Sequence, residues 1–175
     1  MNWPGSWRRV QELVEQNYES LYRYAYRLSG SAVDADDLTQ ETFCRAQMQL
    51  HQLRDPGRAK AWLFAILRNC FLLRNRSQRT ERAVELSVVG DVPAREESDD
   101  REISPERLQE ALNELPEPFR TPVILFYFEE FSYRDIAEHL NLPIGTVMSR
   151  LSRGKAHLKR QLTAEASPRS SSHEL

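Results

Sequence analysis

Four acidic residues lie close together near the N-terminal third of this chain of 175 residues. They are Asp34, Asp36, Asp37 and Glu41, and no base lies among them. Carboxylates grouped in this way could bind Mg²⁺, favour the start of a helix, or form a docking patch for a basic partner. No nucleophile–base pair stands out and the basic helices hold no matching acid cluster, so a metal-dependent nuclease is the weakest interpretation. We predict no catalytic residue, no metal and no cofactor.

The basic residues gather in two other stretches. Residues 58–79 hold six Lys or Arg and no acid, among aromatic and apolar side chains. Residues 146–162 hold five Lys or Arg and, again, no acid. A solvated helix face normally mixes both signs, because opposite charges four residues apart attract. The two stretches therefore predict nucleic-acid binding, and the aromatic one also suits unstacked bases.

The second basic stretch belongs to a helix-turn-helix pattern over residues 132–160. Ser132 and Asp135 have the spacing of an N-terminal cap, and Pro143 ends the first helix. The second helix has an apolar stripe at spacing four, formed by Val147, Leu151, Gly154, Leu158 and Leu162. This shape fits the major groove of DNA. A purely structural hairpin is the alternative, and it explains the absence of acids less well.

Helical periodicity elsewhere predicts an all-α protein. Residues 6–28 indicate two amphipathic helices, ended by Ser29 and Gly30. In the helix over 33–49 we expect the acids and Thr42 to lie outward, and Val33, Leu38, Phe43 and Ala46 to face inward.

The helix over 58–79 should have a core stripe of Trp62, Ile66, Cys70 and Leu73, broadened by Leu63, Leu67 and Phe71. Cys44 and Cys70 lie within helical patterns, and we expect both to be small buried thiols in a reducing cytoplasm. Two further helices should cover 104–115 and 118–130.

Charge divides the chain into three parts. Residues 1–80 hold 12 basic and 8 acidic side chains, residues 81–118 hold 4 and 12, and residues 119–175 hold 8 and 6. We predict a domain at 6–79, a flexible acidic linker at 80–103, a second domain at 104–162 and a disordered tail at 163–175. No long apolar run or signal peptide is present, so we expect a cytoplasmic protein without membrane insertion.

Three stretches, taken in order, resemble the extracytoplasmic-function group of bacterial RNA polymerase sigma factors. They are DADDLTQETFCRA at 34–46, AWLFAILRN at 61–69 and LNLPIGTVMSRLSRGKAHL at 140–158. The resemblance covers roughly residues 10–79 and 104–162. It implies two small helical domains, region 2 and region 4, joined by the linker.

The resemblance also implies roles for particular residues. The first stretch would dock on the RNA polymerase core enzyme through Asp37, Gln40, Glu41 and Phe43. The loop at 53–59 and the second stretch would read and open the promoter −10 element, with a base flipped into a pocket. The matching positions are Leu53, Arg68 and Asn69, with Arg74 and Arg76 on phosphates.

The helix-turn-helix would read the −35 element as duplex. The matching positions are Thr146, Ser149, Arg150, Arg153 and Lys155. An anti-sigma factor is a further expected partner. Met148 and Gln47 depart from the family pattern, since many relatives carry a base and an aromatic residue there.

An ordinary helix-turn-helix regulator with a sensory N-terminal domain is the alternative. It would bind duplex DNA without polymerase, as a dimer on a palindrome. The basic helix over 58–79 argues against it, because a sensory domain does not need such a helix.

Overall fold

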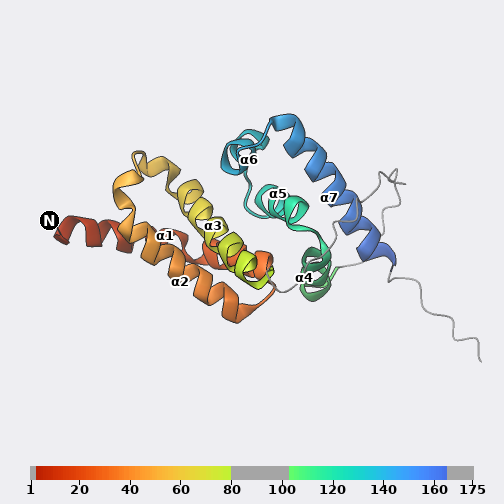
Figure 1. Cartoon of the computed structure of the whole chain (residues 1–175), viewed down its shortest axis with the longest axis horizontal. Helices are drawn as coiled ribbons and strands as arrows, with labels where there is room; N and C mark the ends of the chain where they lie inside the picture. Colours follow the sequence, from red (N-terminus) through yellow and green to blue (C-terminus); the bar gives the residue numbers. More distant parts are fainter. Residues whose placement is uncertain (1–2, 80–102, 165–175) are drawn as a thin grey trace, which may run out of the picture.

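The computed structural model describes residues 3–79 and 103–164, and every regular element in these ranges is a helix. The all-α prediction is therefore confirmed. The α-helices are α1 (Trp3–Ser29), α2 (Ala32–Met48), α3 (Ala59–Arg79), α4 (Pro105–Glu114), α5 (Glu117–Tyr127), α6 (Tyr133–Leu140) and α7 (Ile144–Ala164), with short 3₁₀ turns η1 (Leu50–Gln52) and η2 (Pro56–Arg58). Helices α1–α3 form one group and α4–α7 another, side by side (Figure 1).

The predicted linker and tail lie almost entirely outside the described residues. At the near end of the tail, α7 continues to Ala164, so the prediction of a disordered segment from residue 163 is wrong by two residues. No helix within 3–79 or 103–164 is both long and apolar enough to cross a membrane.

Helix α1 is one continuous helix, so the prediction of two helices within residues 6–28 is wrong. The region between them holds no breaker. Asn17, a residue that favours turns, is buried and its amide donates a 2.9 Å hydrogen bond to the Leu13 carbonyl one turn earlier. The predicted end is confirmed, because Gly30 has φ +72 and follows Ser29 directly.

Helix α2 is capped by Ser31, whose side chain accepts a hydrogen bond from the Asp34 backbone N–H. Two of its facing assignments are wrong. Val33 is 72% exposed, whereas Thr42 is fully buried. The Thr42 hydroxyl donates to the Leu38 carbonyl at 2.6 Å, which satisfies its polar atom and lets the methyl group pack inside.

Helix α3 supplies the centre of the first group. Its fully buried face is Leu63, Phe64, Leu67 and Cys70. Leu73, predicted in the core stripe, is 50% exposed, because the buried face is centred one residue later than Trp62 and Ile66 suggest. Cys44 is exposed rather than buried, on the outer side of α2.

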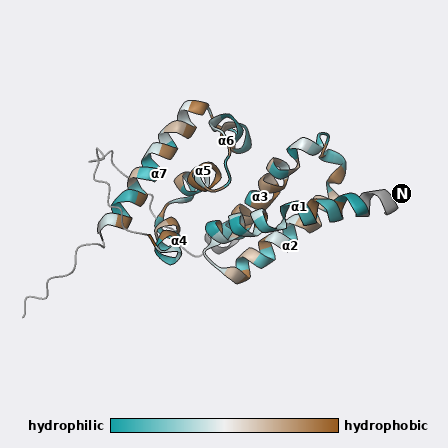
Figure 2. Ribbon diagram, turned by 180° about the vertical axis from the view of Figure 1, so that it is seen from behind, coloured by the Kyte–Doolittle hydropathy of each residue, from teal (hydrophilic) through white to brown (hydrophobic). Residues whose placement is uncertain are grey.

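The helix-turn-helix is formed by α6 and α7. Ser132 and Asp135 make the predicted capping box in both directions. Asn141 ends α6 in the left-handed conformation (φ 53), and the Leu142 N–H then bonds the Ala137 carbonyl at 2.9 Å. Most helices present apolar residues on one side and polar residues on the other (Figure 2).

Gly154 lets α7 approach α5 closely. A Cβ at this position would lie 2.6 Å from Cγ2 of Val123 and 3.5 Å from the Phe119 carbonyl oxygen. We therefore expect Gly154→Ala to lower the free energy of unfolding by about 1–3 kcal/mol, although alanine is the better helix former. Chemical denaturation measures this difference.

The matched control is Gly145→Ala in the first turn of α7, where an added Cβ meets nothing within 4 Å. Its gain in helix propensity should stabilise the chain by up to about 1 kcal/mol. Equal stability of the two variants would contradict the close approach at Gly154.

Glu129, between α5 and α6, is a buried acid with 1% of its side chain exposed. Burial raises its pKa, and Lys60, with Nζ 3.5 Å from Oε2, only partly offsets this. The ionised form therefore destabilises the fold, and stability should fall as pH rises from the usual glutamate value of 4.5 through the raised pKa.

Glu129→Gln removes this charge. We expect its melting temperature at pH 7 to exceed that of the wild type by about 3 °C, with no difference below pH 4. Glu130→Gln, at an exposed neighbour, is the control and should change neither value. A lower melting temperature for Glu129→Gln at pH 7 would show that the Lys60 attraction dominates instead.

Candidate docking and nucleic-acid surfaces

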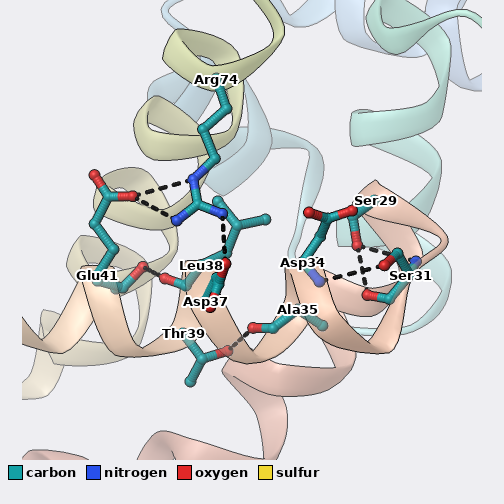
Figure 3. Close-up of polar contacts among 10 residues, drawn as sticks. Ser29, Ser31, Asp34, Ala35, Asp37, Leu38, Thr39, Glu41 and Arg74 are labelled. Carbon is teal, nitrogen blue, oxygen red and sulfur yellow. Dashed lines mark hydrogen bonds and ion pairs between the residues drawn. The ribbon is translucent and has the colours of Figure 1, made fainter.

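Two of the four acidic residues of α2, Asp37 and Glu41, meet Arg74 of α3 (Figure 3). Arg74 binds Oε2 of Glu41 through Nε at 3.2 Å and Nη2 at 3.1 Å, and its Nη1 lies 3.6 Å from Oδ2 of Asp37. Arg45, one turn along α2, binds the other Glu41 oxygen from Nη2 at 2.7 Å. Two guanidinium groups therefore hold one carboxylate in a fixed orientation.

This geometry decides the protonation of Glu41. Partial burial raises its pKa, but hydrogen bonds and attraction from Arg45 and Arg74 outweigh that effect and leave the pKa below the usual range. Glu41 is consequently a carboxylate at neutral pH. Asp37 beside it keeps 59% of its side chain exposed.

The other two residues predicted for docking lie on the same helix. Gln40 is exposed, and Phe43 is half-buried with its ring stacked on Tyr18 of α1, 6.4 Å between centroids. Asp37, Gln40, Glu41 and Phe43 thus all reach the surface of α2. They can present carboxylates beside an aromatic edge to a partner.

Within the described residues, no three His, Cys, Asp or Glu side chains are grouped so that they could hold a metal ion. Asp37 and Glu41, which the nuclease hypothesis needs as ligands, are instead bound to Arg74. The described part of the chain therefore gives that hypothesis no support.

The residues predicted for the −10 element do not form one compact cluster. Leu53 is buried in the loop before α3, whereas Asn69 and Arg76 are exposed far along the helix. Arg68 is half-buried, with Nη2 3.2 Å from Oε1 of Glu117 on α5. Arg74 lies with the acids of α2, so its predicted contact with phosphate competes with an existing ion pair.

A surface pocket of about 370 Å³ opens beside Leu53. Its α1 wall could not be predicted, because nothing in the periodicity of α1 indicates which loop that helix faces. The lining residues are Arg8, Arg9, Glu12, Leu13, Gln16, Leu53, Pro56 and Ala59.

The residues predicted for the −35 element all lie on α7, within its first twelve residues. Ser149, Arg153 and Lys155 are exposed, and Thr146 and Arg150 are half-buried. Ser149 donates to the Thr146 carbonyl at 2.9 Å, so its hydroxyl oxygen remains available as an acceptor. Met148 is 52% exposed on the same helix and adds an apolar side chain to this surface.

The Arg74–Glu41 pair predicts a measurable coupling between α2 and α3. In a double-mutant cycle of Arg74→Gln and Glu41→Gln, we expect a coupling energy of about 0.5–1 kcal/mol in chemical unfolding. Both side chains are about one-third exposed, which is why the value is modest.

Arg23 and Glu19 supply the control cycle, since their pair on α1 is far more exposed (51% and 86%). Its coupling should not exceed about 0.5 kcal/mol. Coupling at Arg74–Glu41 that is no larger than at this control would mean that Arg74 does not hold the α2 carboxylates.

Two family models match the chain, one described as Sigma-70 region 2 over residues 13–81 and one as Sigma-70, region 4 over residues 105–158. The chain is 39% identical over 161 residues to the ECF RNA polymerase sigma factor SigE of Mycolicibacterium smegmatis. That match covers 89% of this chain but only 62% of SigE.

The ECF RNA polymerase sigma factor SigL of Mycobacterium tuberculosis is 33% identical, over 81% of this chain and 82% of SigL. Among solved structures, the sigma factor RpoE from Bartonella quintana, in complex with the anti-sigma factor NepR, superposes with a TM-score of 0.71. It is 31% identical and covers 89% of this chain and 97% of RpoE.

Proposed function

The chain belongs to the ECF family of RNA polymerase sigma factors, the subunits that direct the polymerase to promoters, and we propose that it uses three separate surfaces to do so. The acidic face of α2 docks on the core enzyme, α3 and its preceding loop open the −10 element, and α7 reads the −35 element. The observation that carries this assignment is the presence of both sigma regions in order in one chain. Sigma factors are not enzymes, because the core polymerase performs the catalysis.

The docking surface is supported by the fixed carboxylates of α2. Glu41 is a carboxylate held by Arg45 and Arg74, and Asp37 beside it is exposed. Phe43 lies on the same helix and is half-buried. A preformed acidic patch with an aromatic anchor suits a basic partner surface, because little side-chain freedom is lost on binding.

The −10 assignment is supported by the pocket beside Leu53. Its volume of about 370 Å³ falls in the range of small-molecule sites in general, and it opens between α1 and the loop that the resemblance assigns to the flipped base. Arg8 and Arg9 at its wall supply charge for the adjoining phosphates.

We extend the proposal to domains, partners and location. Region 2 occupies residues 6–79 and region 4 occupies 104–162, with 80–103 as the connection. An anti-sigma factor is a partner, supported by the similarity to RpoE in its complex with NepR. The chain works in the cytoplasm, where polymerase and chromosome are.

The match to region 2 over residues 13–81 distinguishes this proposal from an ordinary helix-turn-helix regulator. Run-off transcription with core enzyme on a genomic promoter library, read by sequencing the start sites, tests it. We expect start sites that share −10 and −35 elements. No stimulation of any promoter in the library would overturn the proposal.

Substitution of Arg153 distinguishes base reading from phosphate attraction at α7. Its exposed guanidinium fits a guanine edge, so Arg153→Ala should reduce transcription by about 10-fold or more at promoters with the preferred −35 base and much less elsewhere. The measurement is run-off transcription on single-base variants of one −35 element.

Lys159→Ala is the matched control. A lysine that meets one phosphate should reduce the salt slope of promoter binding by about one unit and weaken all −35 variants equally. An equal loss at every −35 variant for Arg153→Ala would assign Arg153 to the phosphate backbone.

A further inference from the structure

Two large apolar side chains lie exposed in the first two turns of α7. Ile144 is 48% exposed and Met148 is 52% exposed, whereas Val147 and Leu151 on the buried side of the helix are almost fully covered. Ile144 and Met148 are four residues apart, so their side chains are neighbours on one flank of the helix. The packing of α7 against the rest of region 4 leaves both side chains partly in solvent. That packing therefore does not explain why these two positions are apolar.

The helix that carries this apolar pair is strongly basic. Residues 144–164 hold five Lys or Arg and no Asp or Glu. Two of these cations, Arg153 and Lys155, are exposed farther along the same helix. A surface that combines an apolar pair with charges of one sign needs a ligand that is a polyanion and also carries apolar groups. Duplex DNA meets both requirements, because its phosphates are anionic and its major groove exposes methyl groups.

The turn of helix beneath Met148 is open to a ligand. Side chains of a helix tilt toward its N-terminus, so Met148 leans over the turn that contains Ile144 and Gly145. A Cβ at Gly145 would meet nothing within 4 Å, which shows that this part of the surface is uncovered. In helix-turn-helix proteins the N-terminal residues of the second helix contact base edges. Met148 is therefore placed to reach a base rather than a phosphate.

An apolar side chain limits which base edge Met148 can contact. Guanine, cytosine and adenine present only hydrogen-bond donors and acceptors in the major groove, whereas thymine also presents its C5 methyl group. A thioether satisfies no strong donor or acceptor, so covering a purely polar base edge with it would cost free energy. The flexible methionine side chain instead packs well against a small apolar group. Thymine is the base that this position fits.

We propose that Met148 is a specificity-determining residue of the −35 surface, and that it selects one thymine through contact with the C5 methyl group. Ile144 lies beside it and shields this contact from water. The proposal rests on the −35 role of α7 proposed above. The neighbouring polar residues Ser149 and Arg153, both exposed, supply hydrogen bonds to the adjoining bases or phosphates.

The first test removes the methyl group from the DNA. Deoxyuridine pairs as thymine does but has no C5 methyl group. A promoter found with the run-off library is rebuilt with each −35 thymine, on either strand, replaced in turn by deoxyuridine. With limiting wild-type holoenzyme, transcription should fall about fourfold at one of these positions, which is the effect expected for one methyl group that is no longer buried.

Met148→Ala should lower transcription from the thymine template about fourfold and should then no longer distinguish thymine from deoxyuridine at that position. Met148→Leu keeps an apolar side chain and should keep the preference. Circular dichroism verifies that each variant is folded. Equal transcription of all deoxyuridine templates by the wild type, or a preference that persists in Met148→Ala, would overturn the proposal.

The matched control is Met48→Ala, the same substitution at a methionine of region 2 that is 78% exposed. Its preference for thymine over deoxyuridine should equal that of the wild type, even if total transcription changes. Loss of the preference in this variant as well would contradict a direct contact by Met148.

The second test changes the base that is preferred. Met148→Arg introduces a guanidinium group, which binds the O6 and N7 atoms of guanine. On templates with each of the four base pairs at the position identified, the preferred base should change from thymine to guanine. An unchanged preference for thymine would refute a contact by Met148. Failure of the wild type to transcribe any promoter would instead overturn the proposed function itself.

Discussion

The row of aromatic rings formed by Tyr24, Phe64 and Phe131 is the contact on which the arrangement of the two described helical groups depends. Phe64 lies 4.6 Å from the Tyr24 ring within region 2 and 5.5 Å from the Phe131 ring of region 4. One α3 side chain therefore belongs to the core of its own domain and to the contact with the next. Because large aromatic rings bury much apolar surface, this residue type can serve both purposes.

Most of the charged residues around these rings are paired with an opposite charge. Most of the cations that make α3 look like a nucleic-acid helix already have protein partners, either the acids of α2 or those of region 4. A phosphate group that contacted α3 would therefore have to displace a carboxylate from these cations.

Local features of the fold were predictable from the sequence, and the family assignment from three short stretches is confirmed. The Ser132–Asp135 capping box and the break at Asn141 were predictable because they depend on neighbours in the chain. The pair of Glu41 and Arg45 has the i,i+4 spacing and could also have been predicted. The roles assigned to individual site residues stay predictions.

Features set by packing were not predictable. Thr42 was assigned outward because its hydroxyl is polar, but a backbone carbonyl satisfies that hydroxyl. Cys44 is predicted to be buried because it is a small thiol within a helical pattern, but it is exposed. Arg68 with Glu117, 49 residues apart, has no periodic signature, since nothing local indicates that two domains meet there.

The last turn of α1 has a consequence for how the protein is made. A helix leaves its final carbonyl groups without partners, and here Arg120 donates to the Leu28 carbonyl at 2.9 Å while Gln109 approaches those of Tyr26 and Arg27. Arg120 follows Leu28 by 92 residues. The Leu28 carbonyl therefore gains this protein partner only after residue 120 has been synthesised.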